Sequence, residues 1–240
     1  MSGRKIVLPH NWRERPYQAA LWDHLTSGGK RALAVWHRRA GKDDVALHWA
    51  MCSAWTRVGN VWHCLPEYGQ GRKALWTAVN PHSGKRRIDE AFPAELRETV
   101  SENEMFIRFR NGSTWQIIGS DSYDKTVGSG VIGITYSEWA LSNPSAWGYH
   151  RPMLEENNGW GLFITTPRGR NHAYDLANYA QGHKSWFYQR LTARDTGALS
   201  EEKLAETLEE YEALYGEDAG RAQFEQEYLC SWNASTLGSY

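Results

Sequence analysis

The sequence predicts an α/β fold in which helices cover both faces of a mostly parallel sheet. Short buried runs alternate with helical patterns along the chain, as in a three-layer αβα sandwich. The run 131–136, Val-Ile-Gly-Ile-Thr-Tyr, has so little polar content that we expect a central strand there. Two alternating segments within 105–118 flank Asn111-Gly112, which predicts an antiparallel hairpin in addition to the parallel strands.

The remaining helices and strands are predicted from the spacing of apolar residues and from the residues at which each apolar run ends. Apolar residues recur every three or four positions in the predicted helices 14–27, 42–57, 69–80, 200–215 and 218–229. Short runs predict strands at 31–36, 60–65, 131–136, 160–165 and 185–191. Ligands of such folds bind at the carboxyl ends of the strands, so the polar residues at those ends are the candidates for a site.

Composition excludes several classes of protein. The 240 residues suit one large domain or two small ones, and 41% hydrophobic residues suffice for a sizeable core. Lysine and arginine total 27 against 28 acidic residues, so net charge gives no indication of nucleic-acid binding. Cys52, Cys64 and Cys230 form no C-x-x-C pair, which argues against a disulfide framework and a zinc site. No apolar run approaches the ~20 residues of a membrane span.

The strongest motif is a basic turn between a predicted strand and a predicted helix. The apolar run ending at Trp36 leads into a Gly-containing turn, and a helical pattern begins at Lys42. Backbone N–H groups of such a turn and helix start can bind phosphate, with the lysine as a point charge. We expect nucleotide contacts from His37, Arg38, Arg39, Ala40, Gly41, Lys42, Asp43 and Asp44. A basic surface turn is the alternative, since the standard loop has glycine at position 36 and serine or threonine at position 43.

Two strand ends carry further candidates. Ser137 and Glu138 follow the strand 131–136, where a P-loop ATPase usually has Asp-Glu to hold the magnesium shell and activate water. Thr166 follows the strand 160–165, and its hydroxyl could sense the γ-phosphate. The alternative for Glu138 is an acidic residue that is favoured only by a helix N-terminus. The alternative for Thr166 is a place in an ordinary turn.

The N-terminal Arg-Pro-Tyr-Gln segment suggests a base-binding role. The amide of Gln18 offers a donor and an acceptor to an adenine edge, and the ring of Tyr17 could pack on the base. A surface glutamine is the simpler interpretation.

Together these motifs resemble the ATPase half of a tailed-phage large terminase, the motor subunit that packages DNA into the procapsid. The resemblance rests on Arg-Pro-Tyr-Gln, His-Arg-Arg-Ala-Gly-Lys-Asp, Val-Ile-Gly-Ile-Thr-Tyr-Ser-Glu-Trp-Ala and Leu-Phe-Ile-Thr-Thr-Pro-Arg-Gly, in that order. It covers nearly the whole chain and implies a P-loop NTPase fold. ATP and Mg²⁺ are the implied cofactors, and Glu138, Lys42, Arg39 and Thr166 the implied catalytic residues.

The resemblance also implies partners and a domain plan. We expect a ring, of five subunits, on the phage portal in the host cytoplasm, with double-stranded DNA and a small terminase subunit as partners and no membrane. The isolated chain is expected to be a monomer. Residues 1–228 are expected to form the ATPase domain and 229–240 the start of a linker. The family's nuclease half is missing, so we expect no nuclease activity from this chain.

Two departures from the family pattern concern the metal site. Asp43 stands where Ser or Thr is usual, and Ser137 stands where Asp is usual. Because the two positions face one Mg²⁺ from opposite sides, we interpret them as an exchange of carboxylate and hydroxyl. Both are hard oxygen donors suited to Mg²⁺.

A third departure concerns the arginine finger. The loop 121–130 contains no arginine, so the transition-state cation is expected from Lys125, Arg38, Arg39 or Arg168, and hydrolysis by the monomer is expected to be slow. The basic run 85–87, Lys-Arg-Arg, is either a set of DNA phosphate contacts or a solvated loop.

Two other functions fit part of the sequence. A helicase-like DNA translocase shares the nucleotide motifs but needs a second lobe, and no second phosphate loop is found in the sequence. A non-hydrolysing nucleotide- or DNA-binding scaffold is the other alternative, supported by Asp43 and Ser137.

Overall fold

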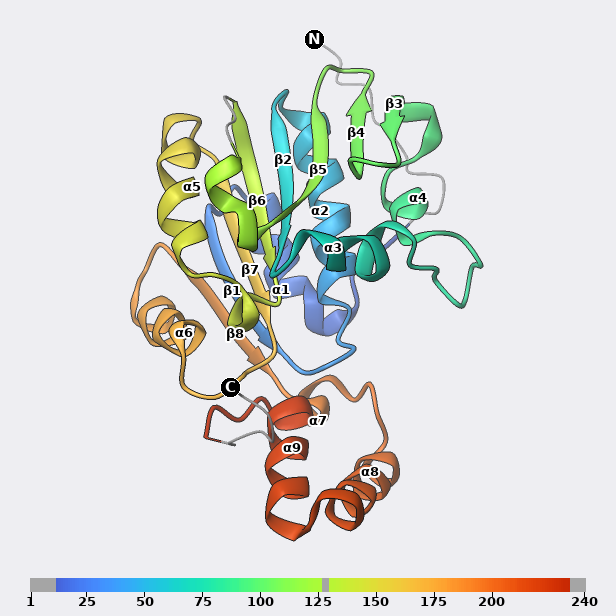
Figure 1. Cartoon of the computed structure of the whole chain (residues 1–240), viewed down its shortest axis with the longest axis vertical. Helices are drawn as coiled ribbons and strands as arrows, with labels where there is room; N and C mark the ends of the chain where they lie inside the picture. The colour runs from blue at the N-terminus through green and yellow to red at the C-terminus, as the bar shows by residue number, and fades with distance from the viewer. Residues whose placement is uncertain (1–11, 127–129, 234–240) are drawn as a thin grey trace.

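The computed structural model describes residues 12–126 and 130–233, which form a sheet with helices on both faces (Figure 1). Within this part of the chain the sheet has 8 strands in the order β3-β4-β5-β2-β6-β7-β1-β8. The strands are β1 Arg31–Trp36, β2 Asn60–Leu65, β3 Arg97–Ser101, β4 Phe106–Phe109, β5 Thr114–Gly119, β6 Val131–Ser137, β7 Trp160–Thr165 and β8 Phe187–Leu191.

Most of the sheet is parallel, as predicted. Every neighbouring pair from β5 to β8 is parallel, whereas β3, β4 and β5 pair in antiparallel fashion. The predicted hairpin is therefore confirmed, and β3 extends it by one strand. All residues of β6 are buried between β2 and β7, which confirms the prediction of a central strand.

The two faces of the sheet contribute to two separate cores. Alternate residues of β1 show this: Ala32, Ala34 and Trp36 join one core, and Leu33 and Val35 join the other. Helices α1 Ala19–Thr26, α2 Lys42–Thr56 and α4 Arg87–Ala91 cover the first face, and α5 Ser145–Glu156 and α6 His172–Gly182 cover the second. The predicted three-layer αβα sandwich is thus confirmed.

The C-terminal helices form a separate small unit. Helices α7 Ala193–Thr196, α8 Glu201–Tyr215 and α9 Glu217–Leu229 pack around Ala193, Leu204 and Phe224. Figure 1 shows α8 and α9 as a pair beyond one end of the sheet. The predicted helices 200–215 and 218–229 are confirmed here. Of the expected linker 229–240, residues 234–240 lie outside the described residues.

Two predicted helices are too long, and several elements were not predicted. The segment 14–27 contains the short η1 Pro16–Gln18 and then α1, which begins only at Ala19. The segment 69–80 is helical only in α3 Tyr68–Gly71 and the adjoining π-turn η2 Arg72–Trp76. The N–H of Thr77 bonds to the carbonyl of Arg72, five residues earlier, so the last turn is a wider π-turn. The unpredicted helix α5 contains Pro152, which obscures its helical pattern. The short elements η1 Pro16–Gln18, η3 Ala94–Leu96, η4 Ser120–Lys125 and η5 Trp139–Leu141 complete the fold.

The three cysteines are free thiols, of which Cys64 and Cys230 are buried and Cys52 is half-buried. In the described part of the chain, no helix has the length and apolar character needed to cross a bilayer.

Candidate active site

The loop between β1 and α2 turns twice through left-handed backbone. Arg39 has φ 66° and Gly41 has φ 75°, and α2 starts immediately afterwards. The left-handed backbone at position 41 favours glycine, because a residue with a side chain is strained at this φ. A Cβ there would also displace the ends of the Arg15 and Gln18 side chains, which lie 2.6 and 2.9 Å from its position.

Lys42 is buried under the loop, at the carboxyl ends of two strands. Its Nζ donates hydrogen bonds to the carbonyl oxygens of Trp36 and His37, each at 3.1 Å, and to Oγ1 of Thr166 at 3.0 Å. Thr166 follows β7, so the ammonium group joins the loop to the neighbouring strand end. Trp36 itself is fully buried in the core.

Asp43 and Ser137, predicted to share a metal, are in direct contact. Oγ of Ser137 donates to Oδ1 of Asp43 at 2.7 Å, and Nε2 of His63 lies 3.4 Å from the same oxygen. Burial alone would raise the pKa of Asp43. However, His63, the nearby Arg87 and the Ser137 hydroxyl together hold that pKa well below its ordinary value. Asp43 is therefore a carboxylate throughout the physiological pH range.

Glu138 leaves β6 in strained backbone geometry. Its φ of 52° is uncommon for a residue with a side chain and occurs mainly where the surroundings enforce it. Here the next residues are fixed to other elements: the carbonyl of Trp139 contacts Nε2 of His172 at 2.7 Å, and the N–H of Ala140 donates to Oγ1 of Thr165 at 3.0 Å. Burial raises the pKa of Glu138, and the charge of Lys42 opposes that rise.

Most of the predicted residues line one cleft of about 510 Å³. Loop residues 38–44 other than Ala40 form one wall together with Glu138, and residues 78–82 and Arg87 form the other. Ser137, Thr166, His37 and Ala40 are buried next to this cleft and contribute through their contacts. Lys125 does not line the cleft.

Gln18 and Tyr17 support the loop. Nε2 of Gln18 donates to the carbonyl of Ala40 at 2.9 Å, and its Oε1 accepts from the N–H of Arg15 at 2.9 Å. The hydroxyl of Tyr17 also donates to Ala40, at 3.2 Å. Both the oxygen and the nitrogen of the Gln18 amide already have hydrogen-bond partners. An adenine base would have to replace these partners, so base recognition by Gln18 stays a prediction.

No family model matches the chain, but the curated proteins that it resembles are large terminase subunits. A large terminase subunit of Thermus virus P23-45 is 26% identical over 177 residues, which cover 68% of this chain and 36% of that relative. The predicted resemblance to large terminases is confirmed. The matched part thus spans little more than a third of the curated terminase.

Solved terminases share the fold. The large terminase ATPase domain of Thermus phage P74-26 has a TM-score of 0.69 and 21% identity, covering 92% of this chain and 95% of that one. The large terminase of another thermophilic bacteriophage, solved in complex with ATP-γ-S, has a TM-score of 0.66 and 16% identity. That match covers 91% of this chain and 52% of the other.

A buried carboxylate on α9 contacts two of the candidate cations. Glu227 is 2% exposed and accepts a short hydrogen bond from Nη1 of Arg168. Its Oε2 lies 3.6 Å from Nη1 of Arg38, and its main-chain carbonyl accepts the N–H of Arg38 at 2.9 Å. The C-terminal helices are thereby attached to the loop, whereas Arg39 forms no ion pair among the described residues.

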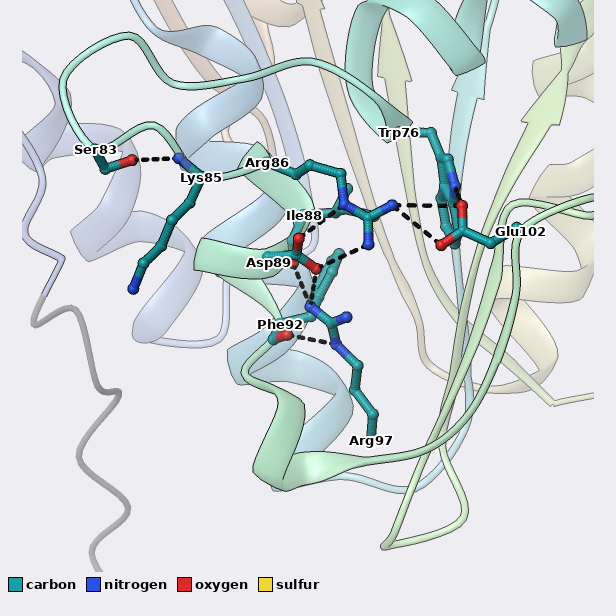
Figure 2. A network of polar contacts seen from close by, with 9 residues as sticks. All are labelled: Trp76, Ser83, Lys85, Arg86, Ile88, Asp89, Phe92, Arg97 and Glu102. Atoms are coloured by element: carbon teal, nitrogen blue, oxygen red, sulfur yellow. Dashed lines mark hydrogen bonds and ion pairs between the residues drawn. The ribbon is translucent and has the colours of Figure 1, made fainter.

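Two of the three residues of the basic run 85–87 form ion pairs with acidic side chains. Arg86 pairs with Asp89 and Glu102, as Figure 2 shows, and Figure 2 also shows the Lys85 side chain pointing away from this cluster. Arg87 starts α4 and pairs with Asp44 at 2.5 Å across the cleft. Of the three side chains, only that of Lys85 has no ion pair with a residue that the structure describes, so it alone stays a candidate for a phosphate contact.

Four residues at the site were not assigned to it from the sequence, although Arg15 lies in the Arg-Pro-Tyr-Gln segment and Arg87 in the basic run 85–87. Glu227, His63, Arg15 and Arg87 all contact loop or cleft residues. Nothing in the sequence pattern distinguishes Glu227 from its acidic neighbours on α9, because only the tertiary fold buries it. His63 had a usable signal, since it is a polar residue inside an otherwise apolar strand.

Proposed function

We propose that the chain is the ATPase motor domain of a viral DNA-packaging terminase. It hydrolyses ATP to translocate double-stranded DNA into a procapsid. The observation that carries the proposal is the buried ammonium of Lys42, which joins the loop carbonyls to Thr166 beside a cleft lined by Glu138. The similarity to a curated terminase and to a terminase fold solved with ATP-γ-S supports it.

The loop and the start of α2 supply the phosphate site in this proposal. Phosphate oxygens bind to N–H groups at the helix start, and Lys42 turns from its carbonyl partners toward the β- and γ-phosphates. Two aspartates in the first turn of α2 oppose an anion there. Arg87 offsets one of them by pairing with Asp44.

The oxygen donors of Asp43 and Ser137 fit Mg²⁺. They lie 2.7 Å apart on two different elements, as needed to share one ion. Among the described residues no group of three or more His, Cys, Asp or Glu side chains is placed to hold a metal. That suits Mg²⁺, which keeps several waters and takes only one or two protein carboxylates beside phosphate oxygens. When bound, Mg²⁺ would neutralise charge that develops on the phosphates.

Glu138 is the proposed general base. It lies in the cleft one residue after Ser137, and its raised pKa makes it a stronger base than an exposed glutamate. It would orient the attacking water and take a proton from it. The hydroxyl of Thr166, just after β7, accepts a hydrogen bond from Lys42. It would lose this bond when the lysine turns to the phosphates, so it would sense their arrival.

The decisive experiment is a nucleotide-binding and hydrolysis assay with Glu138→Gln and Lys42→Ala. We expect Glu138→Gln to bind ATP as the wild type does and to lose hydrolysis, and Lys42→Ala to lose binding. If the wild type binds no nucleotide, the chain is a scaffold module and the proposal is wrong. A helicase-like translocase would instead hydrolyse ATP and unwind a DNA duplex, which a strand-separation assay detects.

The exchange of metal ligands has its own test. The single variants Asp43→Thr and Ser137→Asp are each expected to lose ATPase activity, and the double variant is expected to recover part of it. An inactive double variant would contradict the exchange. Ring formation on a portal, a small terminase partner and a location at the procapsid vertex in the host cytoplasm belong to this proposal as well.

A further inference from the structure

We propose that His63 is a positioning residue for the metal-binding carboxylate of Asp43; this inference rests on the magnesium site of the proposed function. His63 lies in β2 and is 0% exposed. Its Nε2 lies 3.4 Å from Oδ1 of Asp43. No hydrogen bond of acceptable geometry is made by either ring nitrogen within the described residues.

A buried imidazole without hydrogen bonds lowers stability, so its presence calls for a reason. The only acidic side chain within ion-pair distance of the ring, in the described part of the chain, is Asp43. A small rotation of that carboxylate turns the 3.4 Å contact into a hydrogen bond. The strand is otherwise apolar on this face, where Val61 and Leu65 pack into the core.

The sheet places His63 beside the other metal candidate. In the parallel pair β2–β6, His63 is opposite Thr135, two residues before Ser137. Ser137 and His63 therefore approach Asp43 from neighbouring strands, and both contact the same oxygen, Oδ1. With Oδ1 held in this way, Oδ2 would be the oxygen left to bind a cation.

This arrangement explains how a carboxylate on a helix can replace one on a strand. Asp43 comes from the first turn of α2, so it lacks the rigid backbone support of a sheet position. Partners that hold a ligating carboxylate restrict its orientation, and removing such a partner typically lowers metal affinity about 10–100-fold. His63 supplies that restriction from β2.

The test is Mn²⁺ binding in the presence of ADP, measured by electron paramagnetic resonance on the purified chain. His63→Leu and His63→Phe remove both nitrogens, and we expect about 10–100-fold weaker Mn²⁺ binding with unchanged metal-free ADP affinity. His63→Gln keeps a donor near the Nε2 position and is expected to bind Mn²⁺ as the wild type does. His150→Leu is the control, because it removes another fully buried histidine in α5.

Each outcome separates the hypotheses. Wild-type Mn²⁺ affinity in a folded apolar variant, or equal losses in the Gln and Leu variants, would show that His63 only fills the core. An equal loss in His150→Leu would assign the effect to general destabilisation and overturn the proposal. A wild type that binds ADP without Mn²⁺ rejects the metal site itself, and one that binds neither rejects the ATPase function.

Discussion

Arg168 donates a hydrogen bond to the buried carboxylate of Glu227, and this contact joins the turn after β7 to helix α9. The same carboxylate lies 3.6 Å from Arg38 in the loop. A side chain of the C-terminal helices thus bridges the loop that lines the cleft and the turn after β7. The stability of the loop and the docking of α9 should depend on one residue.

Glu227→Gln should lower the free energy of unfolding by about 1–3 kcal/mol, since it removes a buried charge that accepts from an arginine. Urea unfolding followed by far-UV circular dichroism measures the change. Glu210→Gln, on the exposed side of α8, is the matched control and should leave stability nearly unchanged. Equal effects of the two substitutions would show that the buried contact contributes nothing.

Thr166→Val should reduce kcat for ATP about tenfold, which is the effect of losing one hydrogen bond to a charged group that matters in the transition state. The hydroxyl accepts from Lys42 at 3.0 Å and donates to the carbonyl of Trp36 at 3.2 Å. Thr166→Ser keeps this hydroxyl and should retain activity. Loss of activity in the serine variant would point to the methyl group and to packing.

The acidic limb of the pH–rate profile should be set by Glu138. A general base must be deprotonated, and burial raises the pKa of Glu138, so kcat should fall at a pH above the range of an ordinary glutamate. Asp43 cannot cause this fall, since its pKa lies well below its ordinary value. Steady-state rates from mildly acidic to neutral pH test this. A limb below the ordinary glutamate range would contradict the assignment.

Arg39 is expected to supply the transition-state cation from a neighbouring subunit. It is exposed at the cleft and has no ion pair in the described structure, whereas Arg38 and Arg168 are engaged by Glu227. Arg39→Ala should lower kcat of the assembled enzyme by about 10³-fold. Mixing Arg39→Ala with Glu138→Gln should restore activity if the arginine acts across subunits. The same mixing experiment with Arg168→Ala instead of Arg39→Ala provides the comparison.

His150 should make stability depend on pH. Burial lowers its pKa to about 4, and its ring contacts Thr126 and Tyr136. Because the folded pKa is below the unfolded value of 6.5, stability is full above pH 6.5 and falls as the pH decreases toward 4. The expected loss between pH 6 and pH 5 is about 1 kcal/mol. Urea unfolding of His150→Gln should show a flatter dependence over that interval.

The sequence predicted the parallel part of the fold well because each central strand is a short apolar run with a clear end. Residues 31–36, 60–65 and 160–165 are strands with the predicted bounds. Local pattern was less informative at the sheet edge. Strand β3 is mostly exposed and charged, so only its pairing with β4 defines it.

The candidate site was predictable where a motif sits at a strand end. Lys42, Glu138 and Thr166 fall at the ends of three neighbouring strands, and the topology β6-β7-β1 brings those ends together. Long-range partners could not be predicted in this way. Glu227 lies far along the chain from the loop, and the state of the Gln18 amide depends on how closely the N-terminal segment approaches Ala40.

The free cysteines have a practical consequence for labelling the protein at a chosen position. Burial raises the pKa of all three thiols, to about 12 for Cys230, and the thiolate is the form that reacts with maleimides. At neutral pH the native thiols are therefore expected to react more slowly with such labels than an exposed cysteine. A single cysteine introduced at an exposed position of α8 would accept a fluorophore first, so the surroundings of that helix could be followed without replacing any native cysteine.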